Sequence, residues 1–432
     1  MRLFVIVAFA MLAALPVSAE VDIKEVTSPK GIPAWLVEEP SIPFVALEIR
    51  FRGGASLDLP SKRGATNLMT GLLEEGAGAL DSQGFAKATE ALAAQFGYSA
   101  SDDTISISAR FLTENRQEAL ELLRLSLLEP TFDEESLERV RGQVLAGIRS
   151  SEKDPNDIAS RHFDALAFGD HPYGSSLEGT IESVAGLSRE DIVTAHRNAL
   201  ALDRIYVAAV GDITEPELGA LLDDLLGALP ATGADLPARA ELALSGGTTV
   251  VEFDTPQAVA LFGHEGMDRD DEDFFAAYLL NTILGGGGFE SRLMEEVRVK
   301  RGLTYGVYSY LVPKDLAALY LGSVSSANDR IAEAVEVIQS EWARTASEGV
   351  SAEELSKAKA LLTGAYPLRF DGNGSIAQIM VGMQMQDLGV DYIATRNDNV
   401  NAVTLEDVNR VARELLAPDA LQFVIVGKPE GL

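Results

Sequence analysis

The side chains that most often perform chemistry are scarce in this chain and poorly arranged for it. The sequence contains 432 residues, no cysteine and four histidines. No two histidines are four residues apart, and none has a cluster of further ligands beside it, so the histidines predict neither a zinc site nor a catalytic base. We expect each one to lie on the surface or to make a local hydrogen bond. They are His162, His171, His196 and His264.

The segment 64–74 is predicted to be a helix, because its apolar residues recur at helical spacing. The same periodicity leaves Asn67, Thr70 and Gly71 together on another face. None of these three carries the imidazole, thiolate or carboxylate that binds zinc in proteins. Taken alone, such small residues are typical of close packing between helices.

A second segment of interest begins with the glycine run 285–288 and continues to Tyr305. A phosphate-binding loop is excluded, because no Gly-Lys-Ser/Thr follows the glycines, and a flexible turn between helices is the alternative. Arg298 and Tyr305 in this segment are seven residues apart. A guanidinium and a phenol can both donate hydrogen bonds to a peptide carbonyl and stabilise a developing oxyanion. The alternatives are a solvated helix charge for Arg298 and a core aromatic residue for Tyr305.

Around the first segment the sequence resembles the pitrilysin/insulinase-type zinc peptidases, the inverzincins. In that family a helix carries His-x-x-Glu-His, whose histidines bind zinc and whose glutamate activates a water. The three positions fall here on Asn67, Thr70 and Gly71. The family's third ligand, a glutamate on a later helix, falls on Gly147 at the spacing that the family uses (147 − 71 = 76). The resemblance therefore implies a degenerate metal site and no zinc in this chain.

The second segment resembles the family's other half, which has no metal ligands and the pattern Leu-Gly-Gly, Ser-Arg-Leu, Arg and Gly-Leu-x-Tyr. In that half an arginine and a tyrosine reach across a chamber and bind substrate beside the zinc of the other half. The pattern assigns these roles to Arg298 and Tyr305 and adds Gly286 and Gly287 to the substrate-binding set. The family also shares Asp-His-Pro-Tyr-Gly at 170–174, which we interpret as a structural turn.

Residues 1–19 have the parts of a secretory signal peptide. A charged start at Arg2 is followed by an apolar run at 3–15 and by the small-residue cleavage site Val-Ser-Ala at 17–19. We expect cleavage there and a periplasmic mature protein, with an uncleaved N-terminal anchor as the alternative. Because the chain has no cysteine, lipid attachment at cysteine and disulfide bonds are excluded.

Composition is that of a globular protein, with 47% hydrophobic and 23% charged residues. The formal net charge of −31 argues against nucleic acid and against an anionic membrane surface as partners. It favours a neutral or basic peptide over an acidic one.

After residue 20 the chain contains one plan of strands and helices twice, which predicts an α+β fold with two similar units. The first unit is placed at 20–229 and the second at 246–432, joined by a linker at 230–245 that is rich in turn formers. Strands are predicted at 43–51, 104–111, 204–212, 258–263, 318–324 and 421–427, and helices at 83–94, 115–128, 274–284 and 329–348, and from residues 133 and 352 onward. The resemblance implies the same plan, two homologous domains that form half of a clam-shell chamber.

Together these features predict the non-catalytic subunit of an exported, two-subunit zinc endopeptidase. The partner is expected to carry His-x-x-Glu-His and the zinc, and an unfolded peptide is expected to be held in extended form by strand addition. Pairing with itself stays open. One alternative is a peptidase-derived assembly or binding protein without a role in proteolysis, and another is an enzyme with an unrecognised site.

Overall fold

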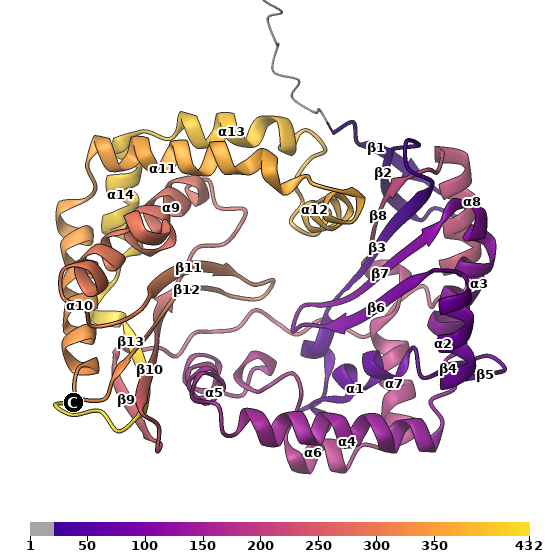
Figure 1. Ribbon diagram of the computed structural model, residues 1–432, viewed down its shortest axis with the longest axis horizontal. Helices are drawn as coiled ribbons and strands as arrows, with labels where there is room; N and C mark the ends of the chain where they lie inside the picture. The colour runs from indigo at the N-terminus through magenta and orange to yellow at the C-terminus, as the bar shows by residue number, and fades with distance from the viewer. Residues whose placement is uncertain (1–20) are drawn as a thin grey trace, which may run out of the picture.

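The computed structural model describes residues 21–432, and the predicted signal peptide at 1–19 lies outside them. Two α+β halves face each other (Figure 1). The prediction of an α+β chain with two similar halves is confirmed. The strands are β1 (Lys24–Thr27), β2 (Pro33–Glu38), β3 (Phe44–Arg52), β4 (Gly76–Ala77), β5 (Leu80–Asp81), β6 (Gln95–Ala100), β7 (Thr104–Leu112) and β8 (Ile205–Gly211) in the first half, and β9 (Gly247–Glu252), β10 (Gln257–Glu265), β11 (Val307–Pro313), β12 (Ala318–Ala327) and β13 (Gln422–Gly427) in the second.

The two large sheets have the same strand order. The first runs β2-β8-β3-β7-β6 and the second runs β9-β13-β10-β12-β11, and β1 adds a further strand beside β2. In both sheets the first pair of this order is parallel and the remaining pairs are antiparallel. A repeated order with repeated strand directions shows that the halves share one topology. Strands β6 and β11 occupy equivalent free edges.

The helices begin at residues that suit a helix start. Asp133, Asp154 and Ser351 each accept a hydrogen bond from a backbone N–H of the first turn and so cap the helices that follow. The helices are α1 (Ala65–Leu72), α2 (Ser82–Ala91), α3 (Arg116–Leu128), α4 (Glu134–Ser151), α5 (Pro155–Phe168), α6 (Ile181–Ala185), α7 (Arg189–Ala199), α8 (Glu215–Leu226), α9 (Phe274–Asn281), α10 (Ile331–Glu348), α11 (Ala352–Ala365), α12 (Asn373–Met385), α13 (Tyr392–Ala402) and α14 (Leu405–Leu415). None of the helices within 21–432 is long and apolar enough to cross a membrane.

Each half has a hydrophobic core between one face of its sheet and the helices on the outside of the molecule. In the first half Val45, Leu47, Ile49 and Phe51 of β3 are fully buried in this core. In the second half Trp342 of α10 is fully buried in the corresponding core. The four residues of β3 alternate along the strand, because every second side chain points to the same face of a sheet.

The other face of each sheet is covered by a helix from the opposite half (Figure 1). Helix α5 belongs to the first half but packs on β10 and β13, with Phe163 buried among residues of the second sheet. Helix α12 belongs to the second half but packs on β3 and β8, with Met380 and Val381 buried against the first sheet. The sequence of β3 alternates like that of a half-buried strand, but the strand is buried on both faces because α12 covers the second one.

Glu48 of β3 lies under α12 and is 5% exposed. Burial raises the pKa of its carboxyl to about 7, although Arg50 and Gln378 of α12 act in the opposite direction. The pKa of Glu48 in the folded protein lies above the ordinary value of 4.5, so the carboxyl ionises at a lower pH in the unfolded chain than in the folded one. The stability of the fold therefore decreases as the pH rises from about 4.5 to about 7. We expect Glu48→Gln to match the wild type near pH 4 and to be more stable by about 2 kcal/mol at pH 8, as measured by urea unfolding.

The control for this prediction is Glu217 on α8, whose pKa is held at about 2 by hydrogen bonds from Arg116 and Thr214. Glu217→Gln should shift stability in the opposite direction, with a loss above pH 4.5 that is small because the side chain is exposed. A stability difference between Glu48→Gln and wild type that is constant from pH 4 to pH 8 would contradict the assignment.

Candidate functional site

Helix α1 carries the degenerate metal positions and is anchored at its start by a buried carboxylate. Asp58 accepts hydrogen bonds from the backbone N–H groups of Gly64 (2.9 Å) and Thr66 (3.0 Å) and from the Thr66 hydroxyl (2.6 Å). Gly64 has φ +97°, and a Cβ there would lie 2.5 Å from the carbonyl oxygen of Glu178. The helix is therefore held firmly although it contains no metal ligand.

The four positions that correspond to zinc ligands and base do not form a polar site. The Thr70 hydroxyl donates to the backbone carbonyl of Asn67 at 2.9 Å, so it is used within its own helix. A Cβ on Gly71 would meet Val140 of α4 at 3.2 Å, which places this glycine at the contact between α1 and α4. Gly147 is exposed on α4, and a Cβ added to it would have no atom outside its own helix within 4 Å. Within residues 21–432, no group of three His, Asp or Glu side chains could hold a metal ion.

The histidines are placed as predicted. His162 is exposed on α5. The ring nitrogens of the others make local contacts, His171 with the carbonyl of Ala238 (3.1 Å), His196 with the carbonyl of Leu127 (2.8 Å), and His264 with the carbonyl of Glu265 (2.6 Å) and the indole N–H of Trp342 (3.0 Å). Burial lowers the pKa of His196 and of His264, which keeps both rings neutral near pH 7.

The glycine run lies where a helix approaches a strand closely. Helix α9 continues into a wider π-helical turn at Thr282–Gly286. A Cβ on Gly285 would lie 2.3 Å from the hydroxyl oxygen of Ser309 on β11, and one on Gly287 would lie 2.5 Å from the carbonyl oxygen of Thr282. A Cβ on Gly286 would meet the side-chain nitrogen of Asn281 at 2.7 Å. Residues 285–287 therefore form a closely packed turn.

Arg298 and Tyr305 lie after this turn in the second half. Arg298 is half-buried in the π-helical turn Met294–Val299, and its guanidinium lies 4.4 Å from the ring centroid of Phe289. Arg298 makes no ion pair with the described residues, and Tyr305 is 85% exposed just before β11. The interpretation of Tyr305 as a core aromatic residue is therefore wrong. Both polar groups remain free to bind another molecule.

The segment Asp170–Gly174 connects the two halves. Tyr173 is buried, donates a hydrogen bond to Asp103 in the β6–β7 turn, and accepts one from the backbone N–H of Leu316 in the β11–β12 turn (3.2 Å). Lys314 of the same turn binds Asp102 (2.7 Å) and lies 4.1 Å from the centre of the Tyr173 ring. The prediction of a structural rather than a catalytic segment agrees with these contacts.

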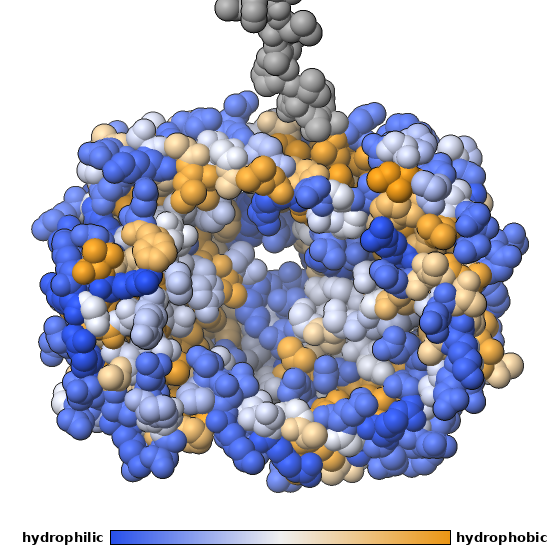
Figure 2. Space-filling model, viewed as in Figure 1, coloured by the Kyte–Doolittle hydropathy of each residue, from blue (hydrophilic) through white to orange (hydrophobic). Residues whose placement is uncertain are grey.

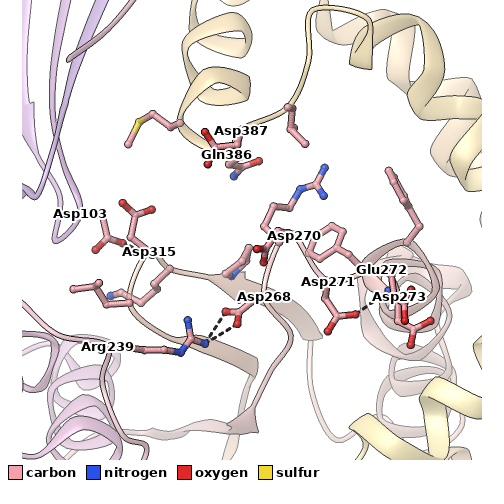
Figure 3. Close-up of a pocket in the computed structure, with 18 of the residues that line it drawn as sticks. Asp103, Arg239, Asp268, Asp270, Asp271, Glu272, Asp273, Asp315, Gln386 and Asp387 are labelled. Atoms are coloured by element: carbon pink, nitrogen blue, oxygen red, sulfur yellow. Dashed lines mark hydrogen bonds and ion pairs between the residues drawn. The ribbon is translucent and has the colours of Figure 1, made fainter. Parts of the chain in front are cut away.

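A cleft of about 1190 Å³ lies between the halves, where the space-filling view shows the molecule hollowed (Figure 2). Among the described residues that line it, nine are Asp or Glu and five are Arg or Lys. One wall is the loop 268–273, whose acidic side chains are shown in Figure 3. Asp268 is paired with Arg239 at 2.7 Å, whereas Asp270, Asp271 and Glu272 form no ion pair within 21–432. The cleft therefore favours a basic guest.

Neither this cleft nor the ion pairs beside it could be predicted from the sequence. The run Asp-Arg-Asp-Asp-Glu-Asp at 268–273 is the one feature of the sequence that could have indicated an acidic site. Such a run of charges is usually a solvated surface, so it does not by itself predict a cleft. Neither Arg298 nor Tyr305 lines the cleft, so the predicted pair and the acidic loop are separate features of the second half.

A duplicated α+β chain whose metal positions hold Asn, Thr and Gly is a peptidase-type fold without its metal site. Comparison with known proteins agrees. Residues 34–181 match the family described as Insulinase (Peptidase family M16), and residues 186–362 match the Peptidase M16 inactive domain. A non-peptidase homolog, YmxG, from Helicobacter pylori is 27% identical over 398 residues, which cover 91% of each chain.

Two further relatives support the same assignment. An uncharacterized zinc protease of Mycobacterium tuberculosis is 30% identical over 306 residues, which cover 69% of each chain. The crystal structure of a peptidase M16 inactive domain from Pseudomonas fluorescens superimposes with a TM-score of 0.88 at 29% identity, covering 94% of this chain and 98% of that one. The chain belongs to the insulinase family of peptidases, family M16. Within that family it is a non-catalytic member.

Proposed function

We propose that the chain is the non-catalytic subunit of an exported, two-subunit zinc endopeptidase. The observation that carries this proposal is the contrast between two sites in one molecule. The metal positions hold Asn67, Thr70, Gly71 and Gly147, whereas Arg298 and Tyr305 are present with their polar groups free. Two hydrogen-bond donors of this kind can stabilise the oxyanion that develops at a scissile carbonyl. The zinc for that reaction would come from a partner that carries His-x-x-Glu-His.

The substrate in this proposal is an unfolded peptide. The free edges of β6 and β11 offer backbone N–H and C=O groups for strand addition, and the acidic cleft favours basic residues. Gly286 and Gly287 take part by letting the turn before Arg298 pack closely. The proposed location is the periplasm, reached through cleavage after Ala19. Nucleic acid and membrane are not proposed as partners, because the net charge is −31.

The experiment combines the mature chain with a homologous chain that carries His-x-x-Glu-His, for which the product of a neighbouring gene is the first choice. Each chain alone and the mixture are tested for cleavage of an unfolded peptide and for bound zinc. We expect no stoichiometric zinc and no cleavage from this chain alone, and cleavage from the mixture. One tightly bound zinc in this chain, or full activity of the partner alone, would refute the proposal.

A second candidate is an assembly or binding protein without a role in proteolysis. The name of the Helicobacter pylori relative, a non-peptidase homolog, favours it. A stable complex that forms with the partner but leaves its cleavage rate unchanged would put this candidate first.

A further inference from the structure

A second cavity, of about 560 Å³, lies between α9, α12, α13 and the turn Tyr366–Arg369. It adjoins the acidic cleft, because Arg269, Phe274 and Leu388 line both. Its lining differs in charge from that of the cleft. Among the described residues, the second cavity is lined by three arginines and by no aspartate or glutamate.

The three arginines are Arg269, Arg369 and Arg396, and none of them forms an ion pair within residues 21–432. Arg396 is 4% exposed and donates only to the carbonyl oxygen of Leu362 and to the side-chain oxygen of Asn397, both at 2.9 Å. A buried guanidinium without a counter-ion is unfavourable, because burial removes its hydration and no carboxylate replaces it. In a chain of net charge −31, a carboxylate-free site of this kind is unusual.

Aromatic rings hold these guanidiniums in place. Arg269 lies 4.3 Å from the ring centroid of Phe274 and donates to the Tyr392 hydroxyl at 2.7 Å. Arg396 lies 4.5 Å from the ring centroid of Tyr366. Stacking on a ring leaves the N–H groups at the edge of a guanidinium available, so both arginines can still donate to a ligand.

The three arginines all act on the phenol of Tyr366, which lines the same cavity. Burial raises the pKa of its phenol to about 12, with Tyr392 acting in the same direction, while Arg396, Arg369 and Arg269 each act to lower it. All three guanidiniums are therefore within electrostatic reach of one hydroxyl. Arginine groups gathered around aromatic walls suit an anion that also carries an apolar or aromatic part.

We infer that this cavity binds the C-terminal carboxylate of a peptide whose last side chain is aromatic or apolar, while the basic body of the peptide lies in the acidic cleft. This inference rests on the proposed peptide binding. It adds the orientation of the bound peptide, whose C-terminus would lie against α12 and α13. The carboxylate supplies the missing counter-ion, and the terminal side chain packs on the aromatic walls. A polyanion is disfavoured, because it would have to lie along the carboxylates of the adjoining loop.

The test compares two forms of one short, N-acetylated, lysine-rich peptide that ends in phenylalanine, one with a free C-terminal carboxylate and one with a C-terminal amide. Binding to the mature chain is measured by calorimetry at low salt. Removing charge-assisted hydrogen bonds should weaken the amide form by on the order of tenfold to a hundredfold. In the double variant Arg269→Gln/Arg369→Gln we expect the acid form to weaken to the affinity of the amide form.

The double variant changes the two arginines that are not fully buried, and circular dichroism should confirm an unchanged fold. Arg413→Gln, an exposed position on α14 outside the cavity, is the matched control and should leave the preference for the acid form intact. Equal affinity for both peptides in the wild type, or a preference that persists in the double variant, would overturn the inference and leave the proposed function standing. Failure of both peptides to bind would overturn the inference and also count against the proposed function.

Discussion

Replacing Arg298 with alanine is expected to lower the turnover of the reconstituted peptidase by about a hundredfold, and Tyr305→Phe should have an effect of the same order. Loss of one donor that stabilises an oxyanion removes a few kcal/mol of transition-state stabilisation. Both side chains are free to act in this way, since Arg298 has no ion pair among the described residues and Tyr305 is 85% exposed. The measurement is cleavage of an unfolded peptide by the mixed subunits.

Two substitutions in the same region serve as controls. Arg301→Ala removes a cation that is paired with Glu296 at 2.7 Å, and Tyr310→Phe removes a phenol from the face of β11. Both should leave the rate close to that of the wild type. If Arg298→Ala and Tyr305→Phe raise only the Michaelis constant, the pair binds substrate and transition state equally. Undiminished rates for both would remove the functional assignment and favour the assembly protein.

Arg63→Met is expected to destabilise the chain by about 3 to 5 kcal/mol, because a buried guanidinium loses four hydrogen bonds, each contributing about 1 kcal/mol. Arg63 is 3% exposed and donates to the carbonyl oxygens of Ala55, Pro172 (2.8 Å) and Ser175 (3.0 Å) and to Asp102 (3.0 Å). Methionine cannot make any of these hydrogen bonds, although Asp102 keeps its ion pair with Lys314 (2.7 Å) and the carbonyl of Ala55 keeps the backbone N–H of Asp58 (3.1 Å). The decrease should appear as a lower urea midpoint with an unchanged slope.

The control for Arg63 is Arg124→Met on α3. Arg124 also contacts two carboxylates, Glu121 at 2.9 Å and Glu129 at 3.5 Å, but these pairs lie at the surface. We expect its loss to change stability by less than about 1 kcal/mol. Similar destabilisation by the two substitutions would contradict the assignment of the effect to the burial of the Arg63 hydrogen bonds. A further check is limited proteolysis, in which Arg63→Met should open cleavage sites near the β6–β7 turn.

Local periodicity predicted most of the elements that build the two cores. The strand predicted at 318–324 is found at 318–327, and the helix predicted from Asp133 begins with Asp133 as its cap. Strands β6, β9 and β11, which lie at sheet edges, were not identified, and neither were β1, β2, helices α5 to α8 and helices α12 to α14. Edge strands bury less of either face, so their apolar periodicity is faint.

The candidate site was likewise predicted only in part. The identity of the residues at 67, 70, 71 and 147 and the presence of Arg298 and Tyr305 follow from the sequence alone. That Tyr305 is exposed, that Arg298 lies on the Phe289 ring, and that the glycine turn packs on β11 required the fold. Exposure of one aromatic residue depends on which neighbours reach it, and these neighbours are distant in sequence.

The sequence by itself determined that this is a duplicated α+β chain whose positions 67, 70, 71 and 147 carry no metal-binding side chain. Spacing within a segment sets which face of a strand or helix is apolar and which side chains it can offer. Only the tertiary structure decided that α5 and α12 each cover the sheet of the opposite half, and that Tyr173 joins the two hairpin turns. It also decided that the arginines at 269, 369 and 396 converge on one cavity. An apolar face or a lone cation is a local property, but the partner that covers or neutralises it is chosen by packing between segments far apart in the chain.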